Sequence, residues 1–523
     1  MEKNWIELDR GCEGKSVMEA LNEQGVYLSG NCGSNGTCGK CQIRICGEAP
    51  APSEPDQKLL SGESLEKGVR LACKTKAAPG MRIVMVTPDE SKMTVESSFW
   101  LPGGIRAGKA SSGEERTGDF GSASAVPGEL GSAVPGEPAS AVPGEFAAAV
   151  DIGTTTIAMS AVETGTGRIV KTVTGVNHQR AFGADVISRM EASNRGKGEQ
   201  LRQAVASDLG ELRKRLGLRE NVKMLISGNT TMEHLLQGMP CTTLGVAPYT
   251  PVDLSLHEYG NMTILPGIST FVGADIVSGI VACGMDEGEE ICLLVDLGTN
   301  GEMAIGNRDR ILSASTAAGP AFEGGNISCG IAGIPGAVCS VEIRDRKARS
   351  RTIGGEPAVG ICGTGVIEVV YELLKEGLID ETGLLDEEYF DSGFPVAEGV
   401  VFTEKDIREV QLAKSAVRAG IEVLIGSYGT DFSHIGKLYL AGGFGQKIDL
   451  IKAAGIGLLP GEVLERTYPV GNTSLAGAVM AAHDPAVLDR MVKVARTAEE
   501  TALAENPQFS DLYMDNMFFP EQE

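Results

Sequence analysis

The sequence predicts a multidomain chain in which a flexible linker joins a small N-terminal module to a large α/β C-terminal module. Three observations carry this prediction. The chain has 523 residues, enough for three or four domains of about 150 residues each. Residues 97–146 are rich in Gly, Pro, Ser and Ala, unlike the segments on either side. After that stretch, a hydrophobic strand that runs into Asp-x-Gly-Thr occurs twice.

The composition excludes several classes of protein. Apolar residues make up 42% of the chain and the mean hydropathy is near zero, which excludes disorder throughout. The net charge of −24 argues against a nucleic-acid partner, because counterion release needs clustered Lys and Arg. The longest apolar stretch, 268–285, is interrupted by Asp275, so we expect no membrane span. The first residues lack the order of a signal peptide, so we expect a cytoplasmic protein whose 12 cysteines are ligands or buried thiols.

The stretch 97–146 is the predicted linker. It contains the hexapeptide Ser-Ala-Val-Pro-Gly-Glu three times, starting at Ser124, Ser132 and Ser140. Pro-Gly pairs break helices and strands, and three short units hold too little apolar bulk for a solenoid. A flexible chain of this length would span roughly 40 Å. We therefore expect residues 1–96 to form a mobile module tethered to residues 147–523.

Four cysteines of the N-terminal module have the layout of metal ligands. They are Cys32, Cys38, Cys41 and Cys73, with the spacing C-x5-C-x2-C-x31-C. Glycines punctuate the loop around the first three, and they let the backbone wrap tightly and direct N–H groups inward. A cluster that carries thiolate and sulfide charge needs such N–H groups, which also tune its potential.

This layout resembles the ferredoxins of the plant and adrenodoxin type, whose 2Fe–2S cluster is held by three loop cysteines and one distant cysteine. The resemblance implies an α+β fold of the β-grasp type, with these four cysteines as the ligands. A structural zinc site and simple buried thiols are the alternatives, although zinc sites usually show two paired CxxC knuckles and this loop shows one. Cys12 and Cys46 have no matching partners and are not assigned to the cluster.

Three elements of the C-terminal part follow one another at nearly equal spacing. In the first two, a hydrophobic strand enters a tight turn, at Asp151-Ile-Gly-Thr-Thr-Thr156 and at Asp296-Leu-Gly-Thr-Asn-Gly301. The third is a strand that runs into Ala441-Gly-Gly-Phe-Gly445. Such turns present N–H groups and hydroxyls that suit phosphate oxygens, and a neighbouring aspartate can hold hydrated Mg²⁺. A strand that ends in Ala-Gly-Gly lets the backbone approach a flat ring or a sugar closely.

In this order the three elements resemble the phosphate-1, phosphate-2 and adenosine motifs of the acetate kinase, sugar kinase and actin superfamily (ASKHA). The resemblance implies two duplicated α/β lobes, 147–288 and 289–523, that close over ATP and Mg²⁺. It implies that Asp151 and Asp296 are catalytic carboxylates that position the metal and its waters. The nucleotide-binding residues that it implies are Gly153, Thr154, Thr155 and Thr156 in the first loop, Gly298, Thr299, Asn300 and Gly301 in the second, and Gly442 and Gly443 near the adenosine.

The second loop departs from a plain Gly-Gly-Thr, so its phosphate contacts stay open. The alternative to the superfamily is a pair of ordinary β-hairpins and an unrelated glycine-rich turn, which has to explain all three elements at once.

Two helices are predicted beside these loops. Thr403–Asp406 has the pattern of a capping box, and it opens a helix whose apolar residues lie roughly on one side. Gly420 inside this helix costs about 1 kcal/mol relative to Ala, which suggests a close neighbour. Gly363-Thr-Gly365 predicts the start of a helix that runs to Leu378 and whose N-terminus could meet phosphate. The segment 313–323 is polar and glycine-rich, so we expect it to line the cleft.

A ferredoxin module ahead of an ATP-binding module of this superfamily is a rare pairing. With this pairing, and with the segments 228–238, 271–277 and 327–333, the chain outside the linker resembles the reductive activators of corrinoid proteins in methyltransferase and O-demethylase systems of anaerobes. The resemblance implies that the 2Fe–2S cluster delivers an electron that converts Co(II) to Co(I) in a corrinoid protein, driven by ATP. It also implies a low-potential electron donor, and it leaves a homodimer open.

Three alternatives remain. An activator of another low-potential enzyme, as in 2-hydroxyacyl-CoA dehydratase systems, would share the ATP module but lack the ferredoxin module. A small-molecule kinase with an accessory ferredoxin needs a carboxylate base, for which Asp185 and Asp275 are candidates, although both also suit helix ends. A redox-sensing protein without catalysis leaves the paired aspartates unexplained. The five histidines show no metal-ligand spacing, and we expect His234 to be structural.

Overall fold

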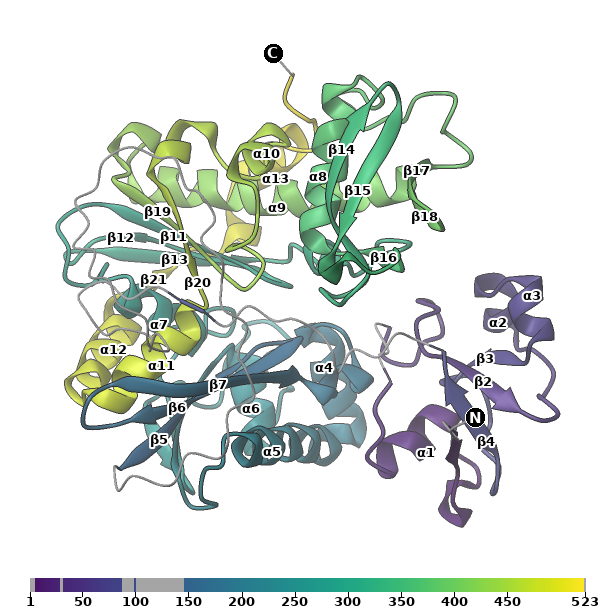
Figure 1. Cartoon of the computed structure of the whole chain (residues 1–523). Helices are drawn as coiled ribbons and strands as arrows, with labels where there is room; N and C mark the ends of the chain where they lie inside the picture. The colour runs from purple at the N-terminus through teal and green to yellow at the C-terminus, as the bar shows by residue number, and fades with distance from the viewer. Residues whose placement is uncertain (1–4, 29–31, 87–97, 100–144, 522–523) are drawn as a thin grey trace.

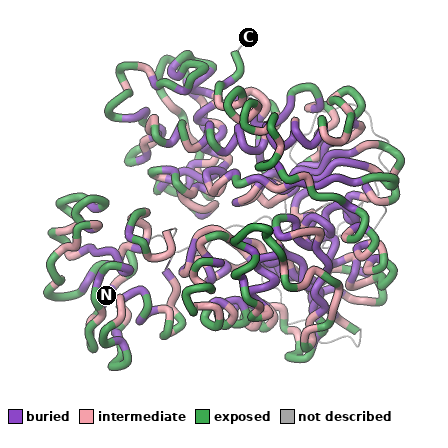
Figure 2. Tube along the Cα trace, turned by 180° about the vertical axis from the view of Figure 1, so that it is seen from behind, coloured by how far each residue is buried: buried purple, intermediate pink, exposed green. Residues whose placement is uncertain are grey.

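The computed structural model describes residues 5–28, 32–86, 98–99 and 145–521. Figure 1 shows a small N-terminal domain beside a larger body that contains two sheets, with helices between and around them. Buried residues lie along the central strands, while exposed residues occupy the outer helices and loops (Figure 2).

The N-terminal domain is a four-stranded sheet packed against a helix. Its strands are β1 Ile6–Glu7, β2 Gln42–Cys46, β3 Val69–Leu71 and β4 Arg82–Met85, in the order β1-β4-β2-β3. Helix α1 Val17–Glu23 begins at a capping box between Ser16 and Glu19, and α2 Glu54–Leu59 and α3 Gly62–Glu66 follow β2. In β2, the buried Ile43 and Ile45 alternate with exposed residues, which gives the sheet one apolar face. The predicted α+β fold is confirmed.

The first α/β lobe contains a six-stranded sheet in the order β7-β6-β5-β8-β10-β9. The bounds are β5 Phe146–Ile152, β6 Thr156–Glu163, β7 Arg168–Val176, β8 Lys223–Gly228, β9 His257–Tyr259 and β10 Met262–Ile264. Strand β5 pairs antiparallel with β6 and parallel with β8. Helices α4 Val186–Ala192, α5 Gly198–Arg215 and α6 Thr230–Gln237 belong to this lobe.

The second lobe repeats this arrangement, with the sheet order β20-β19-β11-β12-β13-β21. The bounds are β11 Cys292–Leu297, β12 Gly301–Gly306, β13 Ile311–Thr316, β19 Lys437–Ala441, β20 Thr467–Gly471 and β21 Glu499–Glu500. Strand β11 pairs antiparallel with β12 and parallel with β19, just as β5 pairs with β6 and β8. The shared order places the turn after β5 and the turn after β11 at equivalent positions, so the two lobes are structural duplicates.

The two sheets are joined through one apolar core. It contains residues of α7 Ala274–Ala282, α11 Thr473–His483 and α12 Ala486–Thr497 together with residues of both sheets. Figure 1 shows these helices between the sheets. Although α11 and α12 come from the C-terminal end of the chain, His483 Nδ1 lies 2.8 Å from the carbonyl oxygen of Thr164 in the first lobe. The lobes therefore share helices rather than only facing one another.

The second lobe carries further elements, and some of them line the cavity described below. They are a sheet of β14 Ala337–Arg344, β15 Lys347–Thr352 and β16 Gly360–Ile361, a hairpin of β17 Phe394–Ala397 and β18 Val400–Phe402, and the helices α8 Gly363–Lys375, α9 Glu404–Tyr428, α10 Leu450–Gly455 and α13 Pro507–Asp515.

Both predicted helices of this lobe are present. Helix α9 begins at the capping box of Thr403 and Asp406. A Cβ on Gly420 would lie 2.9 Å from Met303 Cε, which is the close neighbour that was expected. Helix α8 ends at Lys375 rather than at Leu378, because Gly377 adopts a φ of 63° that ends the helix.

Most of the predicted linker, 97–146, lies outside the described residues. The described residues Ser98 and Phe99 contact the second lobe: the N–H of Asn472 donates to the carbonyl oxygen of Ser98 at 3.2 Å, and Phe99 forms an antiparallel bridge with Gly471. Within the part of the chain that the structure describes, no helix is both long and apolar enough to span a bilayer.

Candidate active site

The four predicted cluster cysteines form two close pairs. The sulfurs of Cys41 and Cys73 lie 3.4 Å apart, and the thiol of Cys38 donates a hydrogen bond to Cys32. A tetrahedral metal about 2.3 Å from each sulfur keeps two sulfurs roughly 3.8 Å apart, so each pair fits one metal ion. The bond from Cys38 lowers the pKa of Cys32 to about 4, and the contact with Cys73 lowers the pKa of Cys41 to about 7. The same contacts raise the pKa of Cys38 and of Cys73.

The backbone of the loop supports these thiols. Gly33, Gly36 and Gly39 have φ values of 55°, 79° and 67°, which L side chains rarely adopt. The N–H groups of Gly36, Thr37 and Cys38 donate to the sulfur of Cys32 and stabilise its thiolate form. Over the described ranges, no three or more His, Cys, Asp or Glu side chains are arranged around one metal ion. Two thiol pairs with inward N–H groups fit a two-iron cluster better than a single zinc ion.

The two predicted phosphate turns differ in detail. In the first, the N–H of Gly153 donates to the carbonyl oxygen of Thr156 at 2.9 Å. In the second, the N–H of Gly298 donates to the carbonyl oxygen of Asn300 at 3.1 Å. A Cβ on Gly153 would lie 2.8 Å from the Thr156 oxygen, whereas the nearest atom to a Cβ on Gly298 would be 3.7 Å away. The first turn is therefore the tighter one, and its glycine is sterically required.

Both turns open into one cavity of about 1100 Å³, which is large enough for a nucleotide. Gly301 is not among its lining residues: a Cβ there would lie 3.0 Å from Thr316 Cγ2 and 3.1 Å from Val417 Cγ2, so this glycine serves the packing of β12 against α9. Its phosphate contact stays a prediction. The predicted residues that do line the cavity are Asp151, Gly153, Thr154, Thr155, Thr156, Asp296, Gly298, Thr299, Asn300, Gly442 and Gly443.

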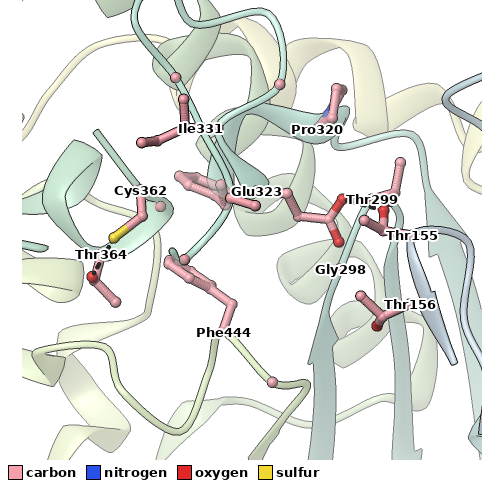
Figure 3. Close-up of a pocket in the computed structure, with 18 of the residues that line it drawn as sticks. Thr155, Thr156, Gly298, Thr299, Pro320, Glu323, Ile331, Cys362, Thr364 and Phe444 are labelled. Carbon is pink, nitrogen blue, oxygen red and sulfur yellow. Dashed lines mark hydrogen bonds between the residues drawn. The ribbon is translucent and has the colours of Figure 1, made fainter. Parts of the chain in front are cut away.

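Glu323 links the two turns. It ends the short helix η5 Pro320–Glu323, and its Oε2 accepts hydrogen bonds from Thr155 Oγ1 at 2.9 Å and from Thr299 Oγ1 at 2.8 Å. Figure 3 shows these three side chains together on one side of the pocket, opposite Thr364 and Phe444. The sequence predicted that the segment 313–323 lines the cleft, but it did not single out this carboxylate. Glu323 stands where it can contact either phosphate loop or a water molecule between them.

Further carboxyl groups gather in the cleft. Burial raises the pKa of Asp275 to about 7 and of Asp296 to about 8, and repulsion from Asp151 adds to both shifts. Burial also raises the pKa of Asp151, although Ser474 and Asn472 each donate a hydrogen bond to it at 2.7 Å. Mutually repelling carboxylates gain from a divalent cation, and Mg²⁺ is commonly held by one or two carboxylates, waters and phosphate oxygens. The donor set therefore fits a hydrated Mg²⁺ beside a nucleotide.

A buried arginine holds the first phosphate turn. Arg189, on α4, donates through Nη2 to the carbonyl oxygen of Thr154 and through Nε to that of Gly183. Burial lowers its pKa to about 9, so it remains a cation at neutral pH. The sequence analysis missed this residue, because an arginine on a helix resembles a surface residue until its partners are known. Its role is to position the turn rather than to contact phosphate directly.

The third motif packs directly on the second. Gly442 has a φ of 91°, and a Cβ there would lie 2.5 Å from the carbonyl oxygen of Leu297 and 2.8 Å from Asp296 Oδ1. Only glycine allows this approach of β19 to the end of β11. Next to it, the ring of Phe444 stacks on Phe322 with centroids 5.6 Å apart. The two rings give the cavity a flat apolar wall that suits a base.

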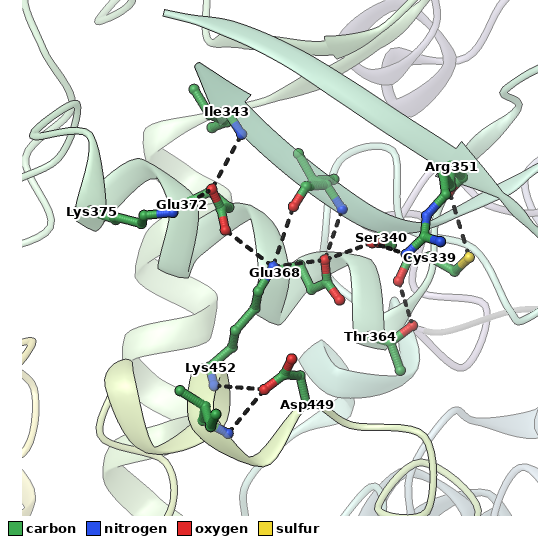
Figure 4. Close-up of polar contacts among 12 residues, drawn as sticks. Cys339, Ser340, Ile343, Arg351, Thr364, Glu368, Glu372, Lys375, Asp449 and Lys452 are labelled. Carbon is green, nitrogen blue, oxygen red and sulfur yellow. Dashed lines mark hydrogen bonds and ion pairs between the residues drawn. The ribbon is translucent and has the colours of Figure 1, made fainter. Parts of the chain in front are cut away.

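The start of α8 lies beside these rings, and a polar network fixes it to β14 (Figure 4). Thr364 Oγ1 donates to the carbonyl oxygen of Cys339 at 3.2 Å. Glu368 Oε2 accepts from the N–H of Val341 at 2.9 Å and from Lys452 Nζ at 3.0 Å. Thr364 lines the cavity, so the predicted helix N-terminus does face the site.

The structure also shows where several other residues considered in the sequence analysis lie. Asp185 is the N-cap of α4 and accepts from the N–H of Ser188 at 2.7 Å, as a helix end requires. His234 is structural as expected, because Val252 N–H donates to its Nε2 at 3.0 Å. Cys46 is exposed on β2, and Cys12 is buried in the N-terminal core.

Three family models match the chain in consecutive segments. The model described as the 2Fe-2S iron-sulfur cluster binding domain matches residues 4–78. The RACo middle region matches residues 146–288, and the C-terminal domain of RACo, the ASKHA domain, matches residues 290–523.

Individual proteins align over longer stretches. The corrinoid activation enzyme RamQ of Eubacterium limosum is 30% identical over 418 residues, which are 71% of this chain and 69% of the relative. The Co(II) methylated amine-specific corrinoid protein reductase of Methanosarcina barkeri is 33% identical over 273 residues, 48% of this chain and 50% of the relative. Among solved structures, a reductive activator for corrinoid, iron-sulfur protein aligns with a TM-score of 0.66 and 26% identity, covering 100% of this chain and 98% of that chain.

Proposed function

The chain belongs to the family of reductive activators of corrinoid proteins, and we propose from this that it reduces the cobalt of a corrinoid protein from Co(II) to Co(I) with the help of ATP. The observation that carries the proposal is the presence, in one chain, of two thiol pairs suited to a 2Fe–2S cluster and of a cleft suited to ATP.

The combination of a cluster and an ATP site in one chain has an energetic reason. A 2Fe–2S cluster held by these cysteines accepts and passes on one electron at a time. If its potential lies about 300 mV above that of the cobalt couple, the one-electron step is uphill by roughly 7 kcal/mol. A nucleotide can offset this cost only through different affinities for two states of the protein. The two lobes, which share α7 and α11, are the element that can exist in two states.

The residues of the cleft have separate roles in binding the metal, the phosphates and the adenosine. Asp151 and Asp296 position Mg²⁺ and its waters, and the turns after them bind phosphate through N–H groups and hydroxyls. Gly442 and Gly443 admit the adenosine.

The domains divide the function in the same way. Residues 1–96 hold the cluster, and the two lobes comprise 147–288 and 289–523. A low-potential donor reduces the cluster in the cytoplasm. Association into a homodimer stays a prediction.

A small-molecule kinase is the second candidate, because the cleft also contains carboxylates that could act as a base. Of the two carboxylates nominated for that role, Asp185 is engaged at a helix end, while Asp275 faces the cavity. A kinase of this kind would transfer phosphate without any need for the cluster thiols. Loss of activity on removal of a cluster cysteine therefore separates the two functions.

The direct test mixes the cluster-loaded chain with Mg-ATP, a strong reductant and a Co(II) corrinoid protein, and follows the visible spectrum of the cobalt. We expect Co(I) to form only when ATP is present. Cys73→Ser should abolish Co(I) formation, whereas the matched variant Cys46→Ser should retain it because Cys46 is exposed and outside both pairs. Equal rates with and without ATP would contradict the proposal.

A further inference from the structure

The N-terminal domain touches both lobes beside the nucleotide cleft. On the first lobe, the ring of Tyr27 lies 4.9 Å from the ring of His178, and Lys197 Nζ lies 3.5 Å from Glu19 Oε1. On the second lobe, Lys40 Nζ donates to the carbonyl oxygen of Gly330 at 3.4 Å. Figure 1 shows the domain next to α4 and facing both halves of the larger body. The domain therefore spans the two lobes at the side of the cleft.

Lys40 belongs to the cluster loop itself. It stands directly before the ligand Cys41, and it lines the nucleotide cavity together with Gln42 at the start of β2 and Val86 after β4. The N–H of Val86 donates to the carbonyl oxygen of Gln42 at 3.3 Å, so one end of the N-terminal sheet forms part of the cavity wall. The cluster loop and the phosphate turns thus share one cavity.

A cation at the position of Lys40 can stabilise negative charge in the cavity. The acidic lining residues outnumber the basic ones, and among the described residues Lys40 is the cation that the N-terminal domain contributes. A triphosphate brings negative charge of its own, so each ammonium or guanidinium group within reach of it is stabilising. The acidic lining residues are Asp151, Asp275, Asp296, Glu302, Glu323 and Glu368, and the basic ones are Lys40, Arg180, Arg351 and Lys447.

We propose that the cluster domain docks across the mouth of the nucleotide cleft and supplies Lys40 as an additional cation for the phosphate groups, so that nucleotide binding and docking of the cluster domain strengthen each other. The inference rests on the nucleotide site proposed above. Thermodynamic linkage requires the effect to be reciprocal: if Lys40 stabilises bound triphosphate, the triphosphate stabilises the docked domain by the same factor. The state of the lobes then depends on both the bound nucleotide and the position of the cluster domain.

The test measures nucleotide affinity of the intact, cluster-loaded chain with Mg²⁺, using a non-hydrolysable β,γ-imido ATP and, separately, adenosine. Lys40→Ala should weaken binding of the ATP analogue about 10-fold, as expected for a charge-assisted hydrogen bond, and leave adenosine binding unchanged. Lys40→Arg should restore most of the affinity, since it keeps the charge. The control Lys67→Ala removes an exposed lysine of the same domain that pairs with Glu63, and should change neither affinity.

A second variant tests docking without touching the cleft. Tyr27 does not line the cavity, but its ring contact with His178 holds the domain on the first lobe. Because docking sets the effective concentration of Lys40 at the cleft, Tyr27→Ala should weaken binding of the ATP analogue and spare adenosine. In the double variant with Lys40→Ala, the Tyr27 change should have no further effect.

The outcomes are separable. If wild-type chain binds both ligands but Lys40→Ala binds the ATP analogue as tightly as wild type, the docking proposal is wrong and the nucleotide site stands. If Lys40→Ala weakens both ligands equally, Lys40 supports the fold rather than the phosphates, which also overturns the proposal. If wild-type chain binds neither ligand, the nucleotide site itself is wrong, and the role of Lys40 falls with it. The visible spectrum of the cluster confirms that each variant is folded and loaded.

Discussion

At the scale of single residues, the cleft is marked by carboxyl groups that burial keeps from ionising freely. The pKa values of Asp275 and Asp296 are raised to about 7 and about 8, so both groups hold protons near neutral pH when no metal is bound. A divalent cation must displace these protons. We therefore expect Mg-ATP to bind more tightly as the pH rises from 6 to 8, with the release of protons.

The same shift predicts how the stability of the nucleotide-free chain depends on pH. The ordinary pKa of Asp296 is 3.8 and burial raises it to about 8, so between these values the folded chain binds a proton that the unfolded chain has released. Stability conferred by this group is thus present at low pH and is lost as the pH rises toward 8. Asp296→Asn removes the dependence, and should raise the melting temperature at pH 8 by at least about 2 °C. The gain should shrink as the pH falls and vanish only below about pH 4, the ordinary pKa of the carboxyl group. A variant that gains nothing at pH 8 would contradict the burial argument.

Glu323 is the residue that we expect to act on water. Its carboxylate accepts from both phosphate loops, and in Glu323→Gln the amide oxygen can still accept those bonds but cannot take up a proton. We predict that ATP affinity changes little, while kcat for ATP hydrolysis falls about 100-fold or more. Phosphate release in single-turnover reactions measures the effect, and Glu376→Gln, at the exposed end of α8, is the control. Hydrolysis at the wild-type rate would assign Glu323 to loop positioning alone.

At the scale of elements, the crossing of α7 and α11 connects the two lobes. Glycines make it close: a Cβ on Gly477 would lie 2.5 Å from Ser278 Cβ, and a Cβ on Gly279 would lie 2.9 Å from Thr473 Oγ1. Helix α7 carries Asp275 to the cleft, and the start of α11 places Ser474 against Asp151. Movement at this crossing therefore shifts Asp275 and Ser474, which belong to or contact the carboxyl groups of the proposed Mg²⁺ site.

Gly477→Ala should push the two helices apart. Overpacking of this kind costs about 1–3 kcal/mol, and we expect ATP affinity to fall along with stability because both helices supply cleft residues. Gly210→Ala is the matched control: a Cβ there meets nothing within 4 Å, so it should stabilise α5 by about 0.5–1 kcal/mol. Denaturant unfolding and ATP titration of both variants provide the comparison. If the two substitutions had the same effect, the close crossing would not matter.

Elements whose signals are local were predictable from the sequence. The strands before Asp151, Asp296 and Gly442 form where their apolar runs predicted them, and the capping box of α9 lies where its residues indicated. Glu323 and Arg189 were not identified, because each acts on a partner distant in the chain: Glu323 meets Thr155 across 168 positions. Periodicity and spacing report local geometry, whereas these contacts depend on how segments distant in the chain are brought together.

At the scale of the whole molecule, the segment that links the cluster domain to the lobes also contacts the second lobe at one point along its length. Ser98 and Phe99 contact the end of β20 and the residue after it, through Gly471 and Asn472. The Ser-Ala-Val-Pro-Gly-Glu repeats therefore join two points that both belong to the C-terminal module. We therefore predict that the stretch of chain before Ser98, and not the repeats, sets how far the cluster domain can reach. The sequence analysis expects the entire stretch 97–146 to act as the tether, and that expectation stays an alternative prediction.

Two deletions distinguish these tethers. Removing residues 124–139, which is two full periods of the repeat, should leave ATP-dependent Co(II) reduction unchanged, because the path from the cluster domain to its attachment at Ser98 keeps its length. Removing residues 88–95 should slow Co(II) reduction strongly. The shortened segment would keep the cluster domain from reaching a corrinoid protein, and electron transfer weakens steeply with distance. ATP hydrolysis at saturating ATP should persist in both variants, because the lobes that bind the nucleotide are intact. If the repeat deletion were the damaging one, the contact of Ser98 and Phe99 with β20 would not hold during turnover, and the full stretch would be the working tether.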